Sequence, residues 1–163
     1  MKKKSMLILL MVSFVFLLCA CDASNIAESP EQQEGAYFAV FEKLYEVDPG
    51  LNGDIEYIAF DLTDVKLEDT SLLIGLFQAF CDNNDYSLLL DDFEGLNEKG
   101  YIKELSFPNG ILIAFKDNEL TKDTLVTEAR KWRSGLGAIG AEYTVKLEDS
   151  TWSITKIANQ WIS

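Results

Sequence analysis

The stretch Ala141-Glu142-Tyr143-Thr144-Val145-Lys146-Leu147, continued by Glu148-Asp149-Ser150-Thr151 and Trp152-Ser153-Ile154-Thr155-Lys156-Ile157, decides the fold. Its outer segments are rich in β-branched and aromatic residues, which favour strands. The four polar residues between them are typical of a turn that joins two antiparallel strands. The sequence therefore predicts a β-hairpin close to the C-terminal end of the chain.

Two further strands are expected upstream of this hairpin. Residues 111–115, Ile-Leu-Ile-Ala-Phe, form a continuous apolar run that follows Pro108-Asn109-Gly110. Residues 125–132 alternate in character, which predicts a strand with two different faces. One face would carry Leu125, Thr127, Ala129 and Lys131, and the other Val126, Glu128, Arg130 and Trp132.

The first half of the chain is mainly helical in pattern. Apolar residues recur at helical spacing over residues 37–45 and 72–80, and we also expect a shorter helix over residues 87–99 that ends at Gly100. Gly75 lies inside the second helix, where it would permit close packing of another element. Residues 55–62 have the composition of a strand.

Helices followed by a run of antiparallel strands predict an α+β fold, with the helices packed on one face of a curved antiparallel sheet. The order of elements over residues 35–163, and the final Trp-x-Ile strand after a charged turn, resemble cystatin-like and NTF2-like domains. Residues 129–141 also resemble a segment of small bacterial lipoproteins. The first resemblance implies a curved sheet that wraps a helix.

The N-terminal end has the pattern of a targeting signal. Three lysines, Lys2 to Lys4, precede an apolar run that ends at Leu18-Cys19-Ala20-Cys21. This pattern is typical of a signal peptide, and its end resembles the lipobox of bacterial lipoproteins. The resemblance implies cleavage after Ala20 and lipidation of Cys21, which would anchor the chain on the extracytoplasmic face of the cell membrane. A short uncleaved anchor is the alternative.

The predicted organisation is thus a signal peptide over residues 1–20, a flexible polar tether over residues 21–34 and one α+β domain over residues 35–163. Loss of the three leader lysines leaves 11 basic against 27 acidic residues, a formal charge of −16. Such a surface repels nucleic acid. The chain has no histidine, which removes the usual general base and the commonest metal ligand. Cys81 is the one thiol left after processing, and we expect it in the core.

The best candidate for a binding site is a basic, glycine-rich segment. Three cations, Arg130, Lys131 and Arg133, flank Trp132 and precede Gly135, Gly137 and Gly140. Consecutive backbone N–H groups and nearby cations can hold an anion. The alternative is a hairpin connection or a bulged bend between strands. The spacing G-x-G-x-x-G does not indicate a nucleotide site, because a strand rather than a helix follows it.

Acidic and aromatic residues offer weaker candidates. Residues 82–85 could bind calcium but lack the alternating spacing of a calcium loop, so we expect a turn that ends a helix. Asp91, Asp92 and Glu94 could pair as acid and base, or form the solvated face of a helix. The aromatic residues of the last third could line a pocket or fill the core. These are Trp132, Tyr143, Trp152 and Trp161.

These observations predict a membrane-anchored lipoprotein with a non-catalytic domain that binds a small ligand or an envelope protein, with no cofactor and no metal. A solute-binding accessory of a transporter and an enzyme that uses carboxylates are the alternatives. A cavity on the sheet that contains paired carboxylates would favour the enzyme, and one walled by aromatic residues would favour ligand binding.

Overall fold

A computed structural model describes residues 32–163. Residues 1–20, Cys21 and most of the predicted tether lie outside the described residues. Helices and a 3₁₀ turn dominate the first half of the domain and long strands the second half. The elements are α2 (Glu34–Glu46), η2 (Pro49–Asn52), β1 (Tyr57–Asp64), α3 (Ser71–Asn83), β2 (Ser87–Leu90), α4 (Phe93–Glu98), β3 (Gly110–Leu120), β4 (Thr124–Ser134), β5 (Gly137–Glu148) and β6 (Thr151–Ile162).

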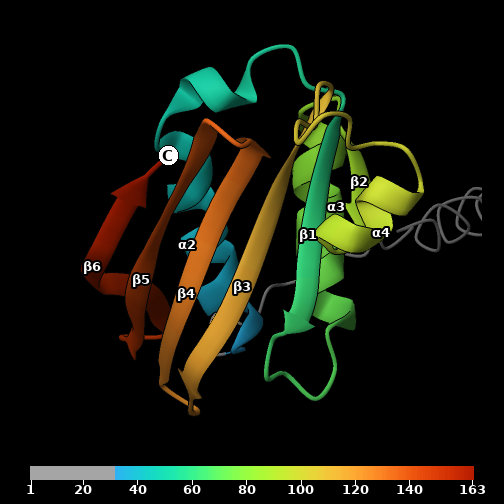
Figure 1. The fold of residues 1–163 in the computed structure, drawn as a ribbon. Coiled ribbons are helices and arrows are strands. Elements are labelled where there is room, and N and C mark those ends of the chain that lie inside the picture. Colours follow the sequence, from blue (N-terminus) through green and yellow to red (C-terminus); the bar gives the residue numbers. More distant parts are fainter. Residues whose placement is uncertain (1–31) are drawn as a thin grey trace, which may run out of the picture.

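The six strands form one sheet in the order β2-β1-β3-β4-β5-β6 (Figure 1). The strands from β3 to β6 are antiparallel neighbours, as the sequence predicted, and the α+β fold class is confirmed. Strand β1 differs, because it pairs in parallel with both β2 and β3. Helix α3 makes the crossover from β1 to β2, since parallel neighbours cannot be joined by a tight turn.

The helix predicted over residues 87–99 is wrong in its first part. Ser87–Leu90 forms β2 and lies beside β1, and only Phe93–Glu98 is helical. Asp92 caps this short helix by accepting a hydrogen bond from the backbone N–H of Gly95 at 2.7 Å. An apolar triplet such as Leu88-Leu89-Leu90 suits a strand as well as a helix, and the free edge of β1 decides between them.

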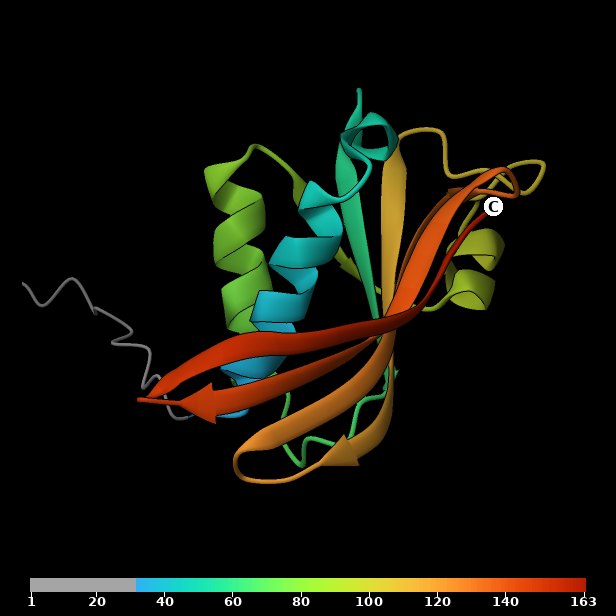
Figure 2. The ribbon, with the colours of Figure 1, turned by 90° about the vertical axis from the view of Figure 1, so that its left-hand side faces the viewer.

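The main core lies between the sheet and the helix pair α2 and α3 (Figure 2). The rings of Phe60 and Phe77 stack with centroids 3.9 Å apart, and Phe41 meets Phe77 edge to face at 5.3 Å. Cys81 is buried in this core, as expected. Gly75 has no atom within 4 Å of the position where a Cβ would stand, so the predicted close packing there is not found.

Helix α4 lies on the opposite face of the sheet from α2 and α3 (Figure 2). It packs with a small second cluster that includes Ala59, Leu96 and Leu112. No other helix of residues 32–163 covers this face (Figure 2). We call the face that carries Ala114, Arg130 and Gly140 the open face, and the face under α2 and α3 the closed face.

The start of the domain is held by the last hairpin. The indole N–H of Trp152 donates to the backbone carbonyl of Gln32 at 2.8 Å, and the same ring lies 2.9 Å from where a Cβ on Gly35 would stand. Gln32 and Gly35 are therefore both packed against the last hairpin. Within residues 32–163, no helix has the length and apolar character that a membrane crossing requires.

Candidate functional site

The alternation of β4 sorts its side chains onto the two faces of the sheet as the sequence predicted. Leu125, Thr127, Ala129 and Lys131 are buried on the closed face, while Glu128 and Arg130 are exposed on the open face. Neighbouring cations of the basic segment therefore lie on opposite sides of the sheet. This separation decides which of them can meet a ligand.

Lys131 is fully buried and links β4 to the end of α2. Its Nζ donates to the carbonyl oxygens of Val47 at 2.5 Å, Asp48 at 3.1 Å and Tyr45 at 3.3 Å, and to Oδ1 of Asn52 at 3.0 Å. These acceptors lie at and beyond the C-terminal end of α2, where helix carbonyls lack partners. Burial lowers the pKa of Lys131 to about 8, and Asp48 acts in the opposite direction.

Arg133 is also occupied by the backbone. Its guanidinium donates to the carbonyl oxygens of Leu51 at 3.0 Å, Gly53 at 2.6 Å and Pro108 at 2.9 Å. These three bonds tie the loop after α2 to the loop before β3. The guanidinium therefore has little capacity left for a ligand.

The remaining residues of the basic segment go to different places. Gly135 lies in the short turn between β4 and β5, and Gly137 opens β5. Trp132 packs edge to face against Phe93 of α4 at 5.0 Å. The common anion site expected from these residues with Arg130, Lys131 and Arg133 is therefore not assembled, and the segment forms a hairpin with a bulge between Trp132 and Ser134. Of the three cations in this segment, Arg130 is the one that lines the hollow described next.

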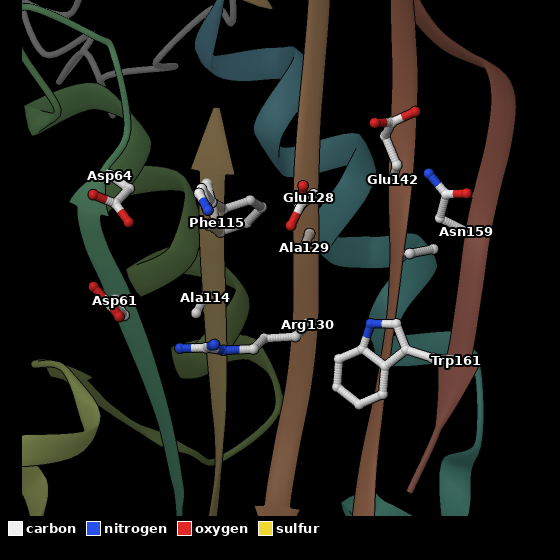
Figure 3. Close-up of a pocket in the computed structure, with 12 residues that line it drawn as sticks. Asp61, Asp64, Ala114, Phe115, Glu128, Ala129, Arg130, Glu142, Asn159 and Trp161 are labelled. Atoms are coloured by element: carbon white, nitrogen blue, oxygen red, sulfur yellow. The ribbon is translucent and has the colours of Figure 1, made fainter. Parts of the chain in front are cut away.

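This hollow lies on the open face, next to the part that α4 covers, and has a volume of about 300 Å³ (Figure 3). Two rows of residues across the sheet form it. The first row contains Asp61, Ala114, Arg130, Gly140 and Trp161, from β1, β3, β4, β5 and β6 in turn.

The second row, two or three residues further along, is charged. It contains Asp64, Lys116, Glu128 and Glu142, and Asn159 of β6 lies beside it. Glu128 and Glu142 stand directly opposite each other on β4 and β5. The hollow thus combines four carboxylates with two cations and one indole ring.

Small residues in the first row create the depression. Ala114 and Gly140 flank Arg130 on either side. A Cβ on Gly140 would stand 2.6 Å from the ring of Trp161, so the indole lies directly against the backbone of β5. The glycine thereby lets the tryptophan form one wall of the hollow (Figure 3). Trp161 remains 45% exposed although it is a large aromatic residue.

Arg130 has no protein partner among residues 32–163. Asp61 accepts a hydrogen bond from the backbone N–H of Thr63 at 3.1 Å, and Glu142 accepts one from Nδ2 of Asn118 at 3.4 Å. In the described part of the chain, neither Arg130 nor Lys116 forms an ion pair within 4.0 Å. Figure 3 shows the Arg130 side chain extended over β3 towards β1.

The other candidate residues from the sequence make contacts that support the fold. Residues 82–85 lie at the end of α3 and beyond it, and Asn84 donates from Nδ2 to the carbonyl of Phe80 at 2.8 Å. Asp91 pairs with Lys99 at 2.6 Å. Burial, with a smaller effect of Asp82, raises the pKa of the Cys81 thiol to about 11. Over residues 32–163, no group of three or more acidic or cysteine side chains is placed to hold a metal ion.

A second hollow, of about 200 Å³, lies between α2, α3 and the last hairpin and is mainly apolar. Trp152 forms part of it, so two of the tryptophans border hollows, while Tyr143 is in the core.

Sequence reasoning missed Asp61, Asp64, Lys116 and Glu142 as neighbours of Arg130. Alternation indicates the face of each residue, but the register between strands was needed to bring them together.

Comparison of the chain with models of known protein families, with curated proteins and with solved structures gives no match.

Proposed function

We propose that this chain is a lipoprotein, anchored through Cys21 on the extracytoplasmic face of the cell membrane, whose domain binds a small ligand in the hollow around Arg130 without catalysing a reaction. The lipobox, Leu18-Cys19-Ala20-Cys21 after a basic and apolar leader, supports the anchor. Two or more acyl chains on one cysteine give stable attachment, whereas a single chain would be marginal.

The observation that carries the binding function is the unpaired guanidinium of Arg130 in a hollow on the open face. The other two cations of the same segment each donate to three or more acceptors, but Arg130 has none within residues 32–163. A guanidinium offers five N–H donors in a fixed plane, which suits recognition of a planar anionic group. The indole of Trp161 supplies an adjacent apolar wall.

An enzyme is the second candidate, because Glu128 and Glu142 are directly opposed in the same hollow. Acid–base catalysis by two carboxylates requires environments that separate their pKa values. Glu128 is exposed and Glu142 is half-buried, so neither carboxylate is enclosed in apolar surroundings. Among the described residues, the lining contains no serine, threonine or cysteine to act as a nucleophile. Binding is therefore the better supported function.

The anchor is tested by growing cells with labelled palmitate. We expect the label on the wild-type chain in the membrane fraction, and an unlabelled precursor of higher mass for Cys21→Ser. The matched control is Cys19→Ser, which should be labelled as strongly as the wild type. A Cys21→Ser chain that still carries the lipid would refute the anchor.

The binding function is tested with the full chain, purified from membranes in detergent. The protein is incubated with the low-mass fraction of a cell-envelope extract, separated from free solutes and denatured, and the released molecules are identified by mass spectrometry. We expect a compound that the wild type and Lys122→Ala retain and Arg130→Ala loses. Retention of nothing, or equal retention by all three proteins, would refute a ligand site at Arg130.

A further inference from the structure

The charges around the hollow limit the chemistry of a ligand, and this inference rests on the proposed function. Four carboxylates and two cations line the site, which leaves it with a net negative charge. A simple anion would pair with Arg130 but would be repelled by the carboxylates. A simple cation would meet the carboxylates but would leave the guanidinium unpaired and would be repelled by it.

We propose that the hollow is a site for a small zwitterion, whose carboxylate pairs with Arg130 and whose ammonium group lies between Glu128 and Glu142. The carboxylate end meets Arg130, with Asp61 in the same row, and the ammonium end meets Glu128 and Glu142, with Lys116 opposite Glu128. A zwitterion is thus the ligand class in which both ends have a partner of opposite charge. Carboxylate and guanidinium form two parallel hydrogen bonds, which are stronger than bonds between neutral groups.

The register of the strands sets the distance between the two ends of the ligand. Arg130 and Glu128 are two residues apart on β4, and Gly140 and Glu142 are two residues apart on β5. Two residues advance a strand by roughly 6.6–6.8 Å. We expect the carboxylate and the ammonium group of the ligand to be separated by about 5–7 Å when the Arg130 side chain, which extends over β3 in Figure 3, turns back over β4 to meet the ligand. This distance exceeds the separation within an α-amino acid and fits an ω-amino acid with four methylene groups.

Trp161 adds a third contact. Its ring lies against Gly140, in the row of Arg130, and Glu142 follows in the next row of the same strand. The methylene chain of the ligand can pack on the exposed part of the ring, and an ammonium group near an indole gains a cation–π attraction. Because the ring lies beside both charged rows, its fluorescence and its indole N–H resonance should report on binding.

The experiment compares four probes on the full chain in detergent. They are 5-aminopentanoate, with both charges at the proposed distance; glycine, with both charges close together; pentanoate, with the anion alone; and pentylammonium, with the cation alone. Binding is followed by the fluorescence of Trp161 in a protein whose other two tryptophans are replaced by phenylalanine, and by the indole resonance in the wild type. We expect 5-aminopentanoate to bind at least tenfold more tightly than each of the other three.

Two variants test which protein groups meet the carboxylate end and the ammonium end of the ligand, and a third variant is the control. Arg130→Gln should weaken binding of 5-aminopentanoate at least tenfold and should improve binding of pentylammonium, because it removes a repulsive charge. Glu128→Gln combined with Glu142→Gln should weaken 5-aminopentanoate and improve pentanoate. Lys122→Ala, in the exposed turn between β3 and β4, should change none of these affinities. Thermal unfolding of each variant verifies that the domain is folded.

Equal affinity for all four probes, or no binding of 5-aminopentanoate to the folded wild type, would overturn the zwitterion proposal. The proposed function would still stand if the extract experiment yields a compound that depends on Arg130. If the extract experiment also yields no compound that depends on Arg130, both proposals are refuted.

Discussion

The two faces of the sheet use the same kind of side chain for different purposes. On the closed face, the cation Lys131 is buried and donates to four acceptors around the end of α2. On the open face, the adjacent cation Arg130 is exposed and has no partner within residues 32–163. Cations that are adjacent in a strand sequence therefore do not form one site, because the strand places them on opposite faces of the sheet.

The aromatic residues show the same contrast. Phe77 on α3 is fully buried against the closed face, whereas Trp161 on the edge strand β6 is 45% exposed. Buried aromatic residues contribute chiefly to stability, and exposed ones in a hollow are available for contact with other molecules. Substitutions on the two faces should therefore separate stability from binding.

The largest effect is expected in the aromatic core. Phe77→Ala should lower the free energy of unfolding by about 3–5 kcal/mol, because it removes a ring stacked on Phe60 and leaves a cavity. Trp161→Ala should cost less than about 1 kcal/mol. Urea denaturation monitored by circular dichroism measures both values, and similar costs would contradict the division into a closed and an open face.

Lys131→Met should have the second-largest effect and lower the free energy of unfolding by roughly 2–3 kcal/mol. Several carbonyl oxygens near the end of α2 lose their charged donor in this variant. Methionine keeps the length of the side chain and so limits the change in packing. Lys122→Ala is the control and should stay within about 0.5 kcal/mol of the wild type. A loss for Lys131→Met no larger than that of the control would show that these contacts contribute nothing.

A pH dependence should distinguish Lys131 from the exposed cations. Burial lowers its pKa to about 8 in the folded chain, and the ordinary value is about 10.4. Between these two values the unfolded chain binds more protons, so the contribution of Lys131 to stability rises with pH, by about 1 kcal/mol per pH unit. Urea denaturation between pH 8 and 9.5 should therefore show stability rising more steeply for the wild type than for Lys131→Met. Parallel curves would contradict the lowered pKa.

The two arginines should affect different properties. Loss of Arg133 should lower stability, and loss of Arg130 should remove binding. Arg133→Ala should cost about 1–2 kcal/mol, because three backbone carbonyls lose a donor, and should leave binding of 5-aminopentanoate unchanged. Arg130→Ala should change stability by less than about 0.5 kcal/mol and abolish binding. Thermal unfolding and fluorescence titration of the two variants provide the comparison. If Arg133→Ala alone removed binding, the site would lie at the hairpin turn instead.

Much of the fold could be predicted from local patterns. The alternation of residues 125–132 gave the correct faces of β4, and the last hairpin and the helices α2 and α3 fall where apolar spacing and turn residues placed them. The failure at residues 87–90 has a physical cause. Three consecutive leucines have no period, so pairing with β1 decided their conformation.

The candidate site was less accessible to prediction. Arg130 was recognised as a cation near glycines, and Gly140 as part of a glycine motif, but the role of that glycine is to seat Trp161. Asp61 and Glu142 are 81 residues apart in the chain and no local pattern connects them. They line the same hollow because β1 and β5 belong to one sheet with a definite register.

Local sequence patterns were sufficient to predict the α+β class, the amphipathic helices and the two faces of β4, because periodicity and turn chemistry act between residues that are close in the chain. Three features depend on the folded chain: Lys131 and Arg133 donate to backbone carbonyls, β1 joins the sheet in parallel, and Arg130 has no partner within residues 32–163 although four carboxylates line its hollow. The reason is that the register of strands distant in sequence, and the helices that cover one face of the sheet, fix which charges find partners.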